Sequence, residues 1–320
     1  YGPVATAVQA LASLAGGDSV RLTVFVMALV NAAAFIGTAL LLHRFTRGDA
    51  DLRGRAALLW TVNPLMIYHL AAGMHVDTLA VACMVAALMA RGAASGLLLG
   101  VGIGVKLNAG LVALGPAWEL RRSPGRLAVV AGTATATALV IYGLAGPHVL
   151  DQVAVASKKV SFGTPWHLVK VGLQEAFGPG AYSAWIQAGS LLLMVVLAWL
   201  MLRILPEDTA PAVAGTIVVA WLFAAPYALP WYDGLAFALL AMASWPALEG
   251  FMVARVAILS MGYLPAREAL RPEDLLWMRT VVRERVVPWS LLALTLVLIC
   301  WAVGAGARAR TRTASGAPRP

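Results

Sequence analysis

The sequence predicts an all-α protein that crosses a membrane several times as a bundle of helices. Two observations support this fold class. The chain has 320 residues, of which 61% are hydrophobic and only 12% are charged, whereas a soluble domain carries about twice that share of charge. Apolar runs of about 20 residues recur along it, and a helix of that length crosses the hydrocarbon core of a bilayer.

The apolar runs give the expected elements in order. The clear spans lie at residues 20–43, 54–73, 76–90, 127–146, 184–205, 211–230 and 288–306. Weaker candidates lie at residues 96–118, 234–248 and 251–264. We therefore expect one transmembrane domain over residues 1–306, followed by a basic, disordered cytoplasmic tail over residues 307–320.

Arginine-rich loops predict the orientation of these spans, because short cytoplasmic loops carry an excess of Lys and Arg. Arginines cluster in residues 44–55, in residues 121–126 and in the tail, so these pieces are expected inside. The formal charge of +9 then reflects membrane topology and not nucleic-acid binding. In this orientation residues 147–183 form an external loop, and His75 and Asp77 lie at the external end of a tight helical hairpin.

One segment conflicts with simple crossing. If residues 91 and 121–126 are both inside, residues 96–118 must enter the membrane and return. Glycines surround Lys106 and Asn108 in this stretch, and a broken helix is tolerated at membrane depth where it is buried in protein or faces a wet cavity. We expect a re-entrant hairpin near Lys106. A single kinked span that breaks the charge rule is the alternative.

Residues 265–287 combine five arginines with four acidic residues, a mixture that predicts an amphipathic surface helix. Its side of the membrane is ambiguous, because the arginine excess is small. Chain order makes it external if residues 251–264 return through the membrane.

Lys106 is the clearest functional candidate, because a charged side chain near the centre of a bilayer is costly. It would offer a fixed positive charge to an anionic group; the alternatives are snorkelling to the headgroups or pairing with a buried acid. Only four of the 24 basic residues are lysines, at positions 106, 158, 159 and 170. Lys158 and Lys159 are therefore candidates to assist Lys106, with a solvated loop face as the alternative.

His75 and Asp77 are a second pair of candidates. A carboxylate beside an imidazole can act as a general base or bind sugar hydroxyls. The structural alternative is a turn in which Asp77 caps the following helix. Asn63 and Pro64, in mid-span, are expected to form a proline kink in which Asn63 satisfies a freed backbone carbonyl.

Aromatic residues beside polar ones form a third group. Trp166 with His167, and Trp231 with Tyr232 and Asp233, combine aromatic faces with polar tips that suit stacking against a sugar ring. Anchoring at the membrane interface is the alternative explanation.

Several kinds of site are absent from the sequence. It contains no Gly-rich phosphate loop, no H-E-x-x-H, no G-x-S-x-G and no Cys/His spacing typical of metal ligands. Its two cysteines, Cys83 and Cys300, lie in apolar runs and do not suggest a disulfide framework. Neither a nucleotide site nor a metal site is expected.

A series of motifs runs along nearly the whole chain in a characteristic order. They are Tyr1-Gly2-Pro3, NPLMIYHLAAGMHVDTLAV at 63–81, GVKLNAGLVALG at 104–115, GPHVLDQVAVASKKVSFGTPWH at 146–167, APYALPWYDGLAFALL at 225–240, and the Arg-rich stretch at 263–287. With them the chain resembles the actinobacterial α-1,6-mannosyltransferases that use polyprenol-phosphate-mannose, within the C-type class of multi-spanning glycosyltransferases.

The resemblance implies an enzyme of the cell membrane. It would move a mannosyl unit from polyprenyl-phosphate-mannose to a growing α-1,6-mannan or lipoglycan acceptor on the extracytoplasmic side. No cofactor is implied, because the donor is itself a lipid-linked sugar phosphate. The class carries its catalytic carboxylate in an external loop upstream of the Tyr-Gly-Pro motif, so this sequence is expected to be N-terminally truncated and to lack that residue.

The resemblance and the chemistry together assign roles to the candidate residues. His75 and Asp77 are the catalytic candidates and would contact sugar hydroxyls. Lys106 and Asn108 would approach the lipid phosphate, assisted by Lys158 or Lys159. The remaining substrate-binding candidates are Tyr1, Trp166, His167, Trp231, Tyr232 and Asp233.

A transporter or flippase of a lipid-linked sugar is the main alternative, because it also needs a polar outer cavity. Polar residues continuing into the cytoplasmic half and an internal repeat would be typical of a transporter, and the sequence has neither. A non-catalytic scaffold explains the spans but not Lys106 or the His75–Asp77 pair. Within the enzyme class, the residues do not separate mannose from arabinose or glucose.

Overall fold

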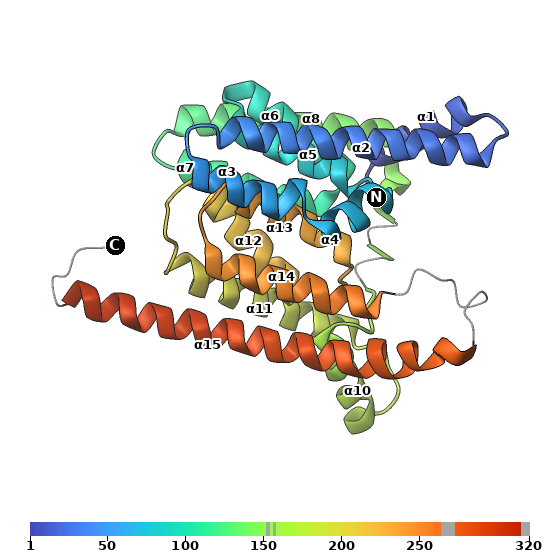
Figure 1. The fold of residues 1–320 in the computed structure, drawn as a ribbon, viewed down its shortest axis with the longest axis vertical. Helices are drawn as coiled ribbons and strands as arrows, with labels where there is room; N and C mark the ends of the chain where they lie inside the picture. Colours follow the sequence, from blue (N-terminus) through green and yellow to red (C-terminus); the bar gives the residue numbers. More distant parts are fainter. Residues whose placement is uncertain (152–153, 156–157, 264–272, 315–320) are drawn as a thin grey trace. The chain divides into compact units, whose positions relative to one another are not determined.

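Helices account for the regular structure throughout the part of the chain that the computed structural model describes, which is residues 1–151, 154–155, 158–263 and 273–314 (Figure 1). The helices long and apolar enough to cross a membrane are α2 (Val20–Phe45), α8 (Pro124–Ala145), α11 (Ser183–Leu202) and the continuous helix Glu273–Arg308. A helix pair over Ala50–Ala72 and Asp77–Met89, bent by 118° at its break, passes the same test as one broken span. The predicted all-α, polytopic fold is confirmed.

The long helices expose apolar side chains to their surroundings. Only 17% of the most apolar window of α2 and 11% of that of α8 are buried inside the protein. Leu40 on α2 and Leu144 on α8 are 65% and 86% exposed. Large apolar surfaces of this kind are rare on soluble monomers but are expected where a helix faces lipid.

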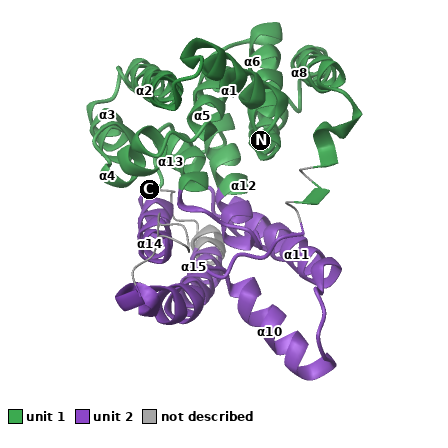
Figure 2. Cartoon of the chain, turned by 90° about the vertical axis from the view of Figure 1, so that its right-hand side faces the viewer, with its two compact units in different colours: residues 1–156, 207–218, 231–245 green, residues 157–206, 219–230, 246–320 purple. Residues whose placement is uncertain are grey.

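The chain divides into two compact units, coloured separately in Figure 2. Unit 1 comprises residues 1–156, 207–218 and 231–245, and unit 2 comprises residues 157–206, 219–230 and 246–320. Each unit is described by itself below. The single transmembrane domain expected over residues 1–306 stays a prediction.

Unit 1 contains most of the N-terminal half of the chain. Besides α2 and α8, its helical elements are α1 (Pro3–Gly16), α3 (Ala50–Ala56), η1 (Ala57–Thr61), α4 (Pro64–Met66), η2 (Ile67–Ala72), α5 (Asp77–Met89), α6 (Gly92–Val105), η3 (Leu107–Ala113), α7 (Leu114–Glu119), η4 (Pro147–Leu150), η5 (Pro230–Asp233) and α13 (Gly234–Leu240). It also holds the first part of α12 (Ala210–Ala224). Helix α1 was not among the expected spans; at 14 residues it is shorter than a bilayer crossing requires.

Helices α6 and α8 pack side by side and run in the same direction. Gly96 of α6 lies against Val130 and Thr133 of α8, Gly100 against Thr137, and Gly104 against Ile141. Spacing small residues by four places them on one helix face and lets two backbones approach closely. Gly96, Gly100 and Gly104 therefore serve the packing of α6 against α8, and the helix is continuous as far as Val105.

The parallel course of α6 and α8 requires the chain to turn back between them. The turn begins at Lys106, whose extended backbone (φ −152°, ψ 118°) ends α6, and the returning segment consists of η3 and α7. Gly110 of η3 comes within 3.4 Å of Ile103 of α6, measured from an added Cβ. The expectation that residues 96–118 go in and come back thus agrees with the course of the chain, with the break at Lys106.

The segment before α5 is kinked at Pro64, as expected. Asn63 donates a hydrogen bond from its side-chain amide to the Leu59 carbonyl (3.1 Å). Its amide oxygen accepts hydrogen bonds from the backbone N–H groups of Leu65 (3.0 Å) and Met66 (3.3 Å). Asn63 therefore satisfies a backbone carbonyl before the kink and caps the first N–H groups of α4 after it.

The ends of unit 1 differ in charge. The arginine loops before α3 and after α7 lie at one end, and the N-terminus lies toward the other (Figure 1). At the arginine end, Arg55 donates a hydrogen bond to Ser244, and Arg121 forms an ion pair with Asp208 (2.9 Å). The two loops predicted to be cytoplasmic therefore share one end of this unit.

Unit 2 contains α10 (Pro165–Phe177), α11, the end of α12, α14 (Pro246–Gly262), η7 (Glu273–Leu275), η8 (Met278–Val286) and α15 (Val287–Ala314). Its core includes Ala228, Leu259, Val287 and Leu291. The described part of the predicted amphipathic segment, residues 273–287, runs directly into α15, and residues 264–272 lie outside the described residues.

Three predicted boundaries in the C-terminal half were wrong. The span expected over 211–230 ends at Ala224, because Pro226 and Pro230 cannot continue a helix. The candidate over 234–248 is only the seven-residue α13. Helix α15 continues to Ala314, beyond the residue where the disordered tail was expected to begin, because this Ala- and Arg-rich stretch favours helix. Residues 315–320 lie outside the described residues.

Candidate active site

The turn between η2 and α5 is tight. Met74 adopts a left-handed conformation (φ 53°) that is strained for a side chain of its size. A Cβ at Gly73 would lie 2.5 Å from the His69 carbonyl oxygen, so glycine is required there. This turn reverses the chain and delivers His75 and Asp77 to the start of α5.

Asp77 is the first residue of α5 and is 4% exposed. The helix has no side-chain capping bond from its N-cap residue Val76, and the carboxylate of Asp77 instead pairs with Lys106. Thr78 donates its hydroxyl to the His75 carbonyl (2.9 Å) and closes the turn. The capping role considered for Asp77 is therefore replaced by an ion pair.

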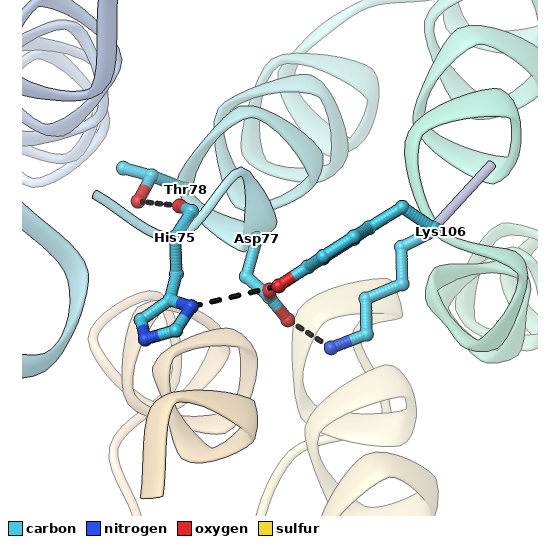
Figure 3. A network of polar contacts seen from close by, with 5 residues as sticks. His75, Asp77, Thr78 and Lys106 are labelled. Carbon is cyan, nitrogen blue, oxygen red and sulfur yellow. Dashed lines mark hydrogen bonds and ion pairs between the residues drawn. The ribbon is translucent and has the colours of Figure 1, made fainter. Parts of the chain in front are cut away.

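Lys106 follows the last residue of α6, and its ammonium group points toward Asp77 (Figure 3). Pairing with a buried acid, one of the alternatives for Lys106, is thus observed. Each charge also lies at the helix end that favours it, with Asp77 at the positive N-terminus of α5 and Lys106 at the negative C-terminus of α6. The backbone dipoles and the ion pair stabilise the same arrangement.

Two aromatic residues of η5 complete the group. The ring of Trp231 stacks on the imidazole of His75, with centroids 3.6 Å apart and an interplanar angle of 13°. The Lys106 ammonium lies 3.4 Å from the centre of the Tyr232 ring, a cation–π contact. We call His75, Asp77, Lys106, Trp231 and Tyr232 the polar cluster.

The N-terminal residues also reach the polar cluster. The Tyr1 hydroxyl lies 3.5 Å from Nδ1 of His75. The Gly2 backbone N–H donates to the Val105 carbonyl (2.9 Å), and a Cβ at Gly2 would collide with the Gly104 carbonyl oxygen. Glycine at position 2 therefore lets the start of α1 lie against the end of α6, which brings Tyr1 to His75.

Asn108 and Asp233 belong to the same unit. Asn108 lies two residues beyond Lys106 in η3, and its side-chain oxygen is buried with no hydrogen-bond partner among the described residues. Asp233 directly follows Tyr232 and is fully buried (0% exposed). Unit 1 thus brings most of the predicted site residues to one end of the fold, away from the arginine loops.

The other predicted site residues belong to unit 2. Lys158 and Lys159 are exposed in an irregular segment. Trp166 donates its indole N–H to the Ala224 carbonyl (2.6 Å) and covers Gly189, which gives it a packing role. Their predicted place beside Lys106 stays a prediction.

His167 lies next to Trp166 in α10 and contacts Phe162 edge-on, with centroids 5.1 Å apart. Burial lowers the pKa of His167, and the nearby Glu284 carboxylate partly opposes that shift. Its predicted role at a sugar likewise stays a prediction.

His69 is a residue that the sequence reasoning missed. It lies in η2, is 2% exposed and contacts Tyr68 edge-on (centroids 5.0 Å apart). Segment η2 is a π-helix, and π-turns are frequent near functional sites. The available signal was a histidine inside an apolar run, six positions before His75 in the same motif.

The ranges that the structure covers contain no group of three or more His, Cys, Asp or Glu side chains placed to hold a metal ion. That the reaction needs no cofactor stays a prediction.

Comparison with known proteins identifies the N-terminal part of the chain. Residues 1–122 match the family described as "Alpha-(1->6)-mannopyranosyltransferase, N-terminal domain". Searches of characterised proteins and of solved structures found no significant match. The matched region holds Tyr1, His75, Asp77, Lys106 and Asn108, while the motifs beyond residue 122 lie outside it.

The resemblance to this family is therefore confirmed for the motifs within residues 1–122. These motifs include three residues of the polar cluster, His75, Asp77 and Lys106. Residues 1–122 of this chain belong to the α-(1→6)-mannopyranosyltransferase N-terminal domain family.

Proposed function

We propose that this chain transfers a mannosyl unit from a polyprenyl-phosphate-linked donor to a growing α-1,6-mannan or lipoglycan acceptor, at the extracytoplasmic face of the cell membrane. The family supports a mannosyltransferase. The donor, the acceptor and the side of the membrane are the new part of the proposal. The observation that carries it is the polar cluster, a lysine–carboxylate–imidazole group buried among the helices of unit 1.

A lipid-linked donor fits the chemistry of these residues. A polyprenyl chain would lie in the bilayer and present its phosphate at the interface, where an ammonium group is a suitable partner. The Lys106 side chain is 15% exposed, so it is largely buried but retains some surface that a phosphate could reach. Asn108 adds an amide nearby in η3. Lys158 and Lys159 are proposed to assist, and no cofactor is proposed.

The charge distribution of unit 1 supports an extracytoplasmic site. The arginine loops of this unit lie at one end, and the N-terminus, whose Tyr1 contacts His75 of the polar cluster, lies toward the other (Figure 1). Loops rich in arginine stay in the cytoplasm, so a site at the opposite end opens outward. This polarity fits a donor whose sugar is already on the outer leaflet.

In the proposed reaction, an acceptor hydroxyl oxygen forms a bond to the anomeric carbon of mannose. The bond from that carbon to the phosphate oxygen breaks, polyprenyl phosphate leaves with the electron pair, and the proton lost by the acceptor hydroxyl ends on the released phosphate. We propose that His75 and Asp77 hydrogen-bond the sugar hydroxyls, and that Tyr1 and Tyr232, which contact His75 and Lys106, line the sugar site. The roles predicted for Asp233, Trp166 and His167 stay predictions. Trp231 is 7% exposed and stacked on His75, so its contribution is to hold the imidazole.

The test is transfer of radiolabelled mannose from polyprenyl-phosphate-mannose, using membranes that carry the full-length protein. The wild type is expected to label an α-1,6-linked mannan product, and Lys106→Ala is expected to reduce that transfer at least tenfold. Asp208→Ala, at the arginine end, is the matched control. Movement of the intact donor across the membrane without product would instead identify a carrier. Full activity of Lys106→Ala would remove the phosphate assignment.

A further inference from the structure

In this state the lysine assigned to the donor phosphate already has an anionic partner. Lys106 is paired with Asp77, and the two side chains are 15% and 6% exposed. The helix ends on which they lie favour the same pairing. A donor phosphate that approaches Lys106 must therefore compete with an internal carboxylate.

The pair is incomplete on the side of Asp77. Its second oxygen, Oδ2, is buried and has no hydrogen-bond partner within the described ranges. Leaving a buried acceptor of this kind unsatisfied is costly, and more so for a charged group. The resting pair is therefore less stable than a fully bonded one, and exchange of its partners is correspondingly easier.

Lys106 also has a second support that does not depend on Asp77. Its ammonium group lies 3.4 Å from the centre of the Tyr232 ring. A cation–π contact holds the ammonium group in place without neutralising its charge. Tyr232 can thus keep Lys106 in position while its anionic partner changes.

We propose that Lys106 exchanges partners when the donor binds, leaving Asp77 for the phosphate of the lipid-linked sugar. Asp77 is released by the exchange and becomes available to a sugar hydroxyl. The Asp77 carboxylate can therefore accept a hydrogen bond from a sugar hydroxyl only after the donor phosphate has bound to Lys106. This inference rests on the proposed function, because the exchanging ligand is the donor phosphate.

The exchange predicts an unusual result for a site residue. Replacing Asp77 by Asn removes the competing carboxylate and leaves a buried ammonium without its counter-charge, which an anionic ligand then restores. Asp77→Asn should therefore bind polyprenyl phosphate about tenfold more tightly than the wild type, a change of about 1.4 kcal/mol. The same variant should transfer mannose more slowly.

The first experiment measures binding of polyprenyl monophosphate to the full-length protein in nanodiscs. Lys106→Gln and the double variant Asp77→Asn/Lys106→Gln should both lose binding at least tenfold. Asp208→Asn, which makes the same charge change at the arginine end, should bind as the wild type does. If the wild type binds and Asp77→Asn binds equally or more weakly, the exchange is refuted and the proposed function stands. If the wild type does not bind polyprenyl phosphate, the proposed donor falls and the exchange falls with it.

A second experiment uses the wild type alone, in case Asp77→Asn does not fold. Dicyclohexylcarbodiimide modifies carboxyl groups in membranes, and its attachment to Asp77 is read by mass spectrometry. Labelling of Asp77 should increase at least threefold when polyprenyl phosphate is added, and should not change with polyprenol, which lacks the phosphate. Equal labelling with and without polyprenyl phosphate would contradict the exchange.

Discussion

At the scale of single residues, the polar cluster shows how an apolar protein places charges. Asp77 and Lys106 each occupy the helix end whose dipole suits them, and they neutralise one another. His75 is held between the ring of Trp231 and the hydroxyl of Tyr1. Every member of the cluster thus has a partner from a different part of the chain, which fixes its orientation.

A second charged group, at the arginine end of unit 1, allows a prediction of pH dependence. Hydrogen bonds from Trp118 and Arg121 lower the pKa of Asp208. A carboxyl group whose pKa is lower in the folded state stabilises the fold above its unfolded pKa of about 4, and this contribution is lost as the pH falls through the folded pKa. The effect is small, because the Arg121 and Asp208 side chains are 36% and 59% exposed.

Asp208→Asn should therefore lower the melting temperature slightly at pH 6–7; the difference from the wild type should begin to shrink below about pH 4 and disappear once the pH is below the lowered pKa of Asp208. The measurement is thermal unfolding of the detergent-solubilised protein across this pH range. Asp18→Asn, at another exposed carboxylate, is the control and should show little difference. A difference that persists unchanged in acid would show that Asp208 acts by something other than its charge.

At the scale of elements, the glycines of α6 position the cluster. Gly96, Gly100 and Gly104 bring α6 against α8, and Gly2 brings α1 against the end of α6. Larger residues would separate these helices and move Lys106 away from Asp77. The spacing of these glycines therefore helps to set the distance between Lys106 and Asp77, because it lets the helices that carry the site pack closely.

Gly100→Ala tests this packing. Its new Cβ would lie 2.5 Å from Cβ of Thr137 and 2.8 Å from the Ala134 carbonyl oxygen. Overpacking of this kind costs about 1–3 kcal/mol, so the variant should unfold at a lower temperature and lose transfer activity.

The matched control for this prediction is Gly132→Ala in the middle of α8, where an added Cβ meets nothing within 4 Å. It should be as stable as the wild type or slightly more stable, because alanine favours helix. Equal effects of the two substitutions would contradict the packing role of Gly100.

At the scale of the whole molecule, the course of the chain through unit 1 brings its two arginine-rich loops together. In unit 1 the loops at residues 44–55 and 121–126 fall at the same end (Figure 1). The second loop reaches that end because the chain turns back at Lys106 and α8 runs parallel to α6. That end carries the arginines, as a cytoplasmic end should. The polar cluster lies at the other end.

Cysteine labelling tests this topology. In a protein whose native Cys83 and Cys300 are replaced by serine, Gly48→Cys and Gly125→Cys should react with a membrane-impermeant maleimide only after the cells are permeabilised. His148→Cys, just beyond the far end of α8, should react in intact cells, because the His148 side chain is 90% exposed. Labelling of Gly48→Cys and Gly125→Cys from opposite sides would refute the return of the chain at Lys106.

Some of these features could be predicted from residues taken alone. Apolar runs of bilayer length identified α2, α8 and α11, because length and composition are local properties. Lys106, His75 and Asp77 could be singled out as candidate site residues for the same reason, since ionisable groups in or beside an apolar run need an explanation. The span predicted over residues 211–230 was too long, because Pro226 and Pro230 prevent α12 from continuing beyond Ala224.

Other features depended on contacts between distant segments. Trp231 was expected to stack on a sugar, whereas it stacks on His75, more than 150 positions earlier in the chain. The glycines of α6 looked like the break in a re-entrant helix and proved to be a packing surface for α8. The spacing of apolar and polar residues within a segment predicts its secondary structure, but it does not predict which distant segment it will contact.

The sequence by itself determined that this chain is a helical membrane protein with an unusual lysine, and its motifs pointed to the family that residues 1–122 match. These properties follow from side-chain hydrophobicity and local spacing. Only the tertiary structure decided that Lys106 meets Asp77 and that aromatic residues from η5 hold both Lys106 and His75. An ion pair between two helix ends exists only once the chain has turned back on itself, because its energy depends on a distance that packing alone sets.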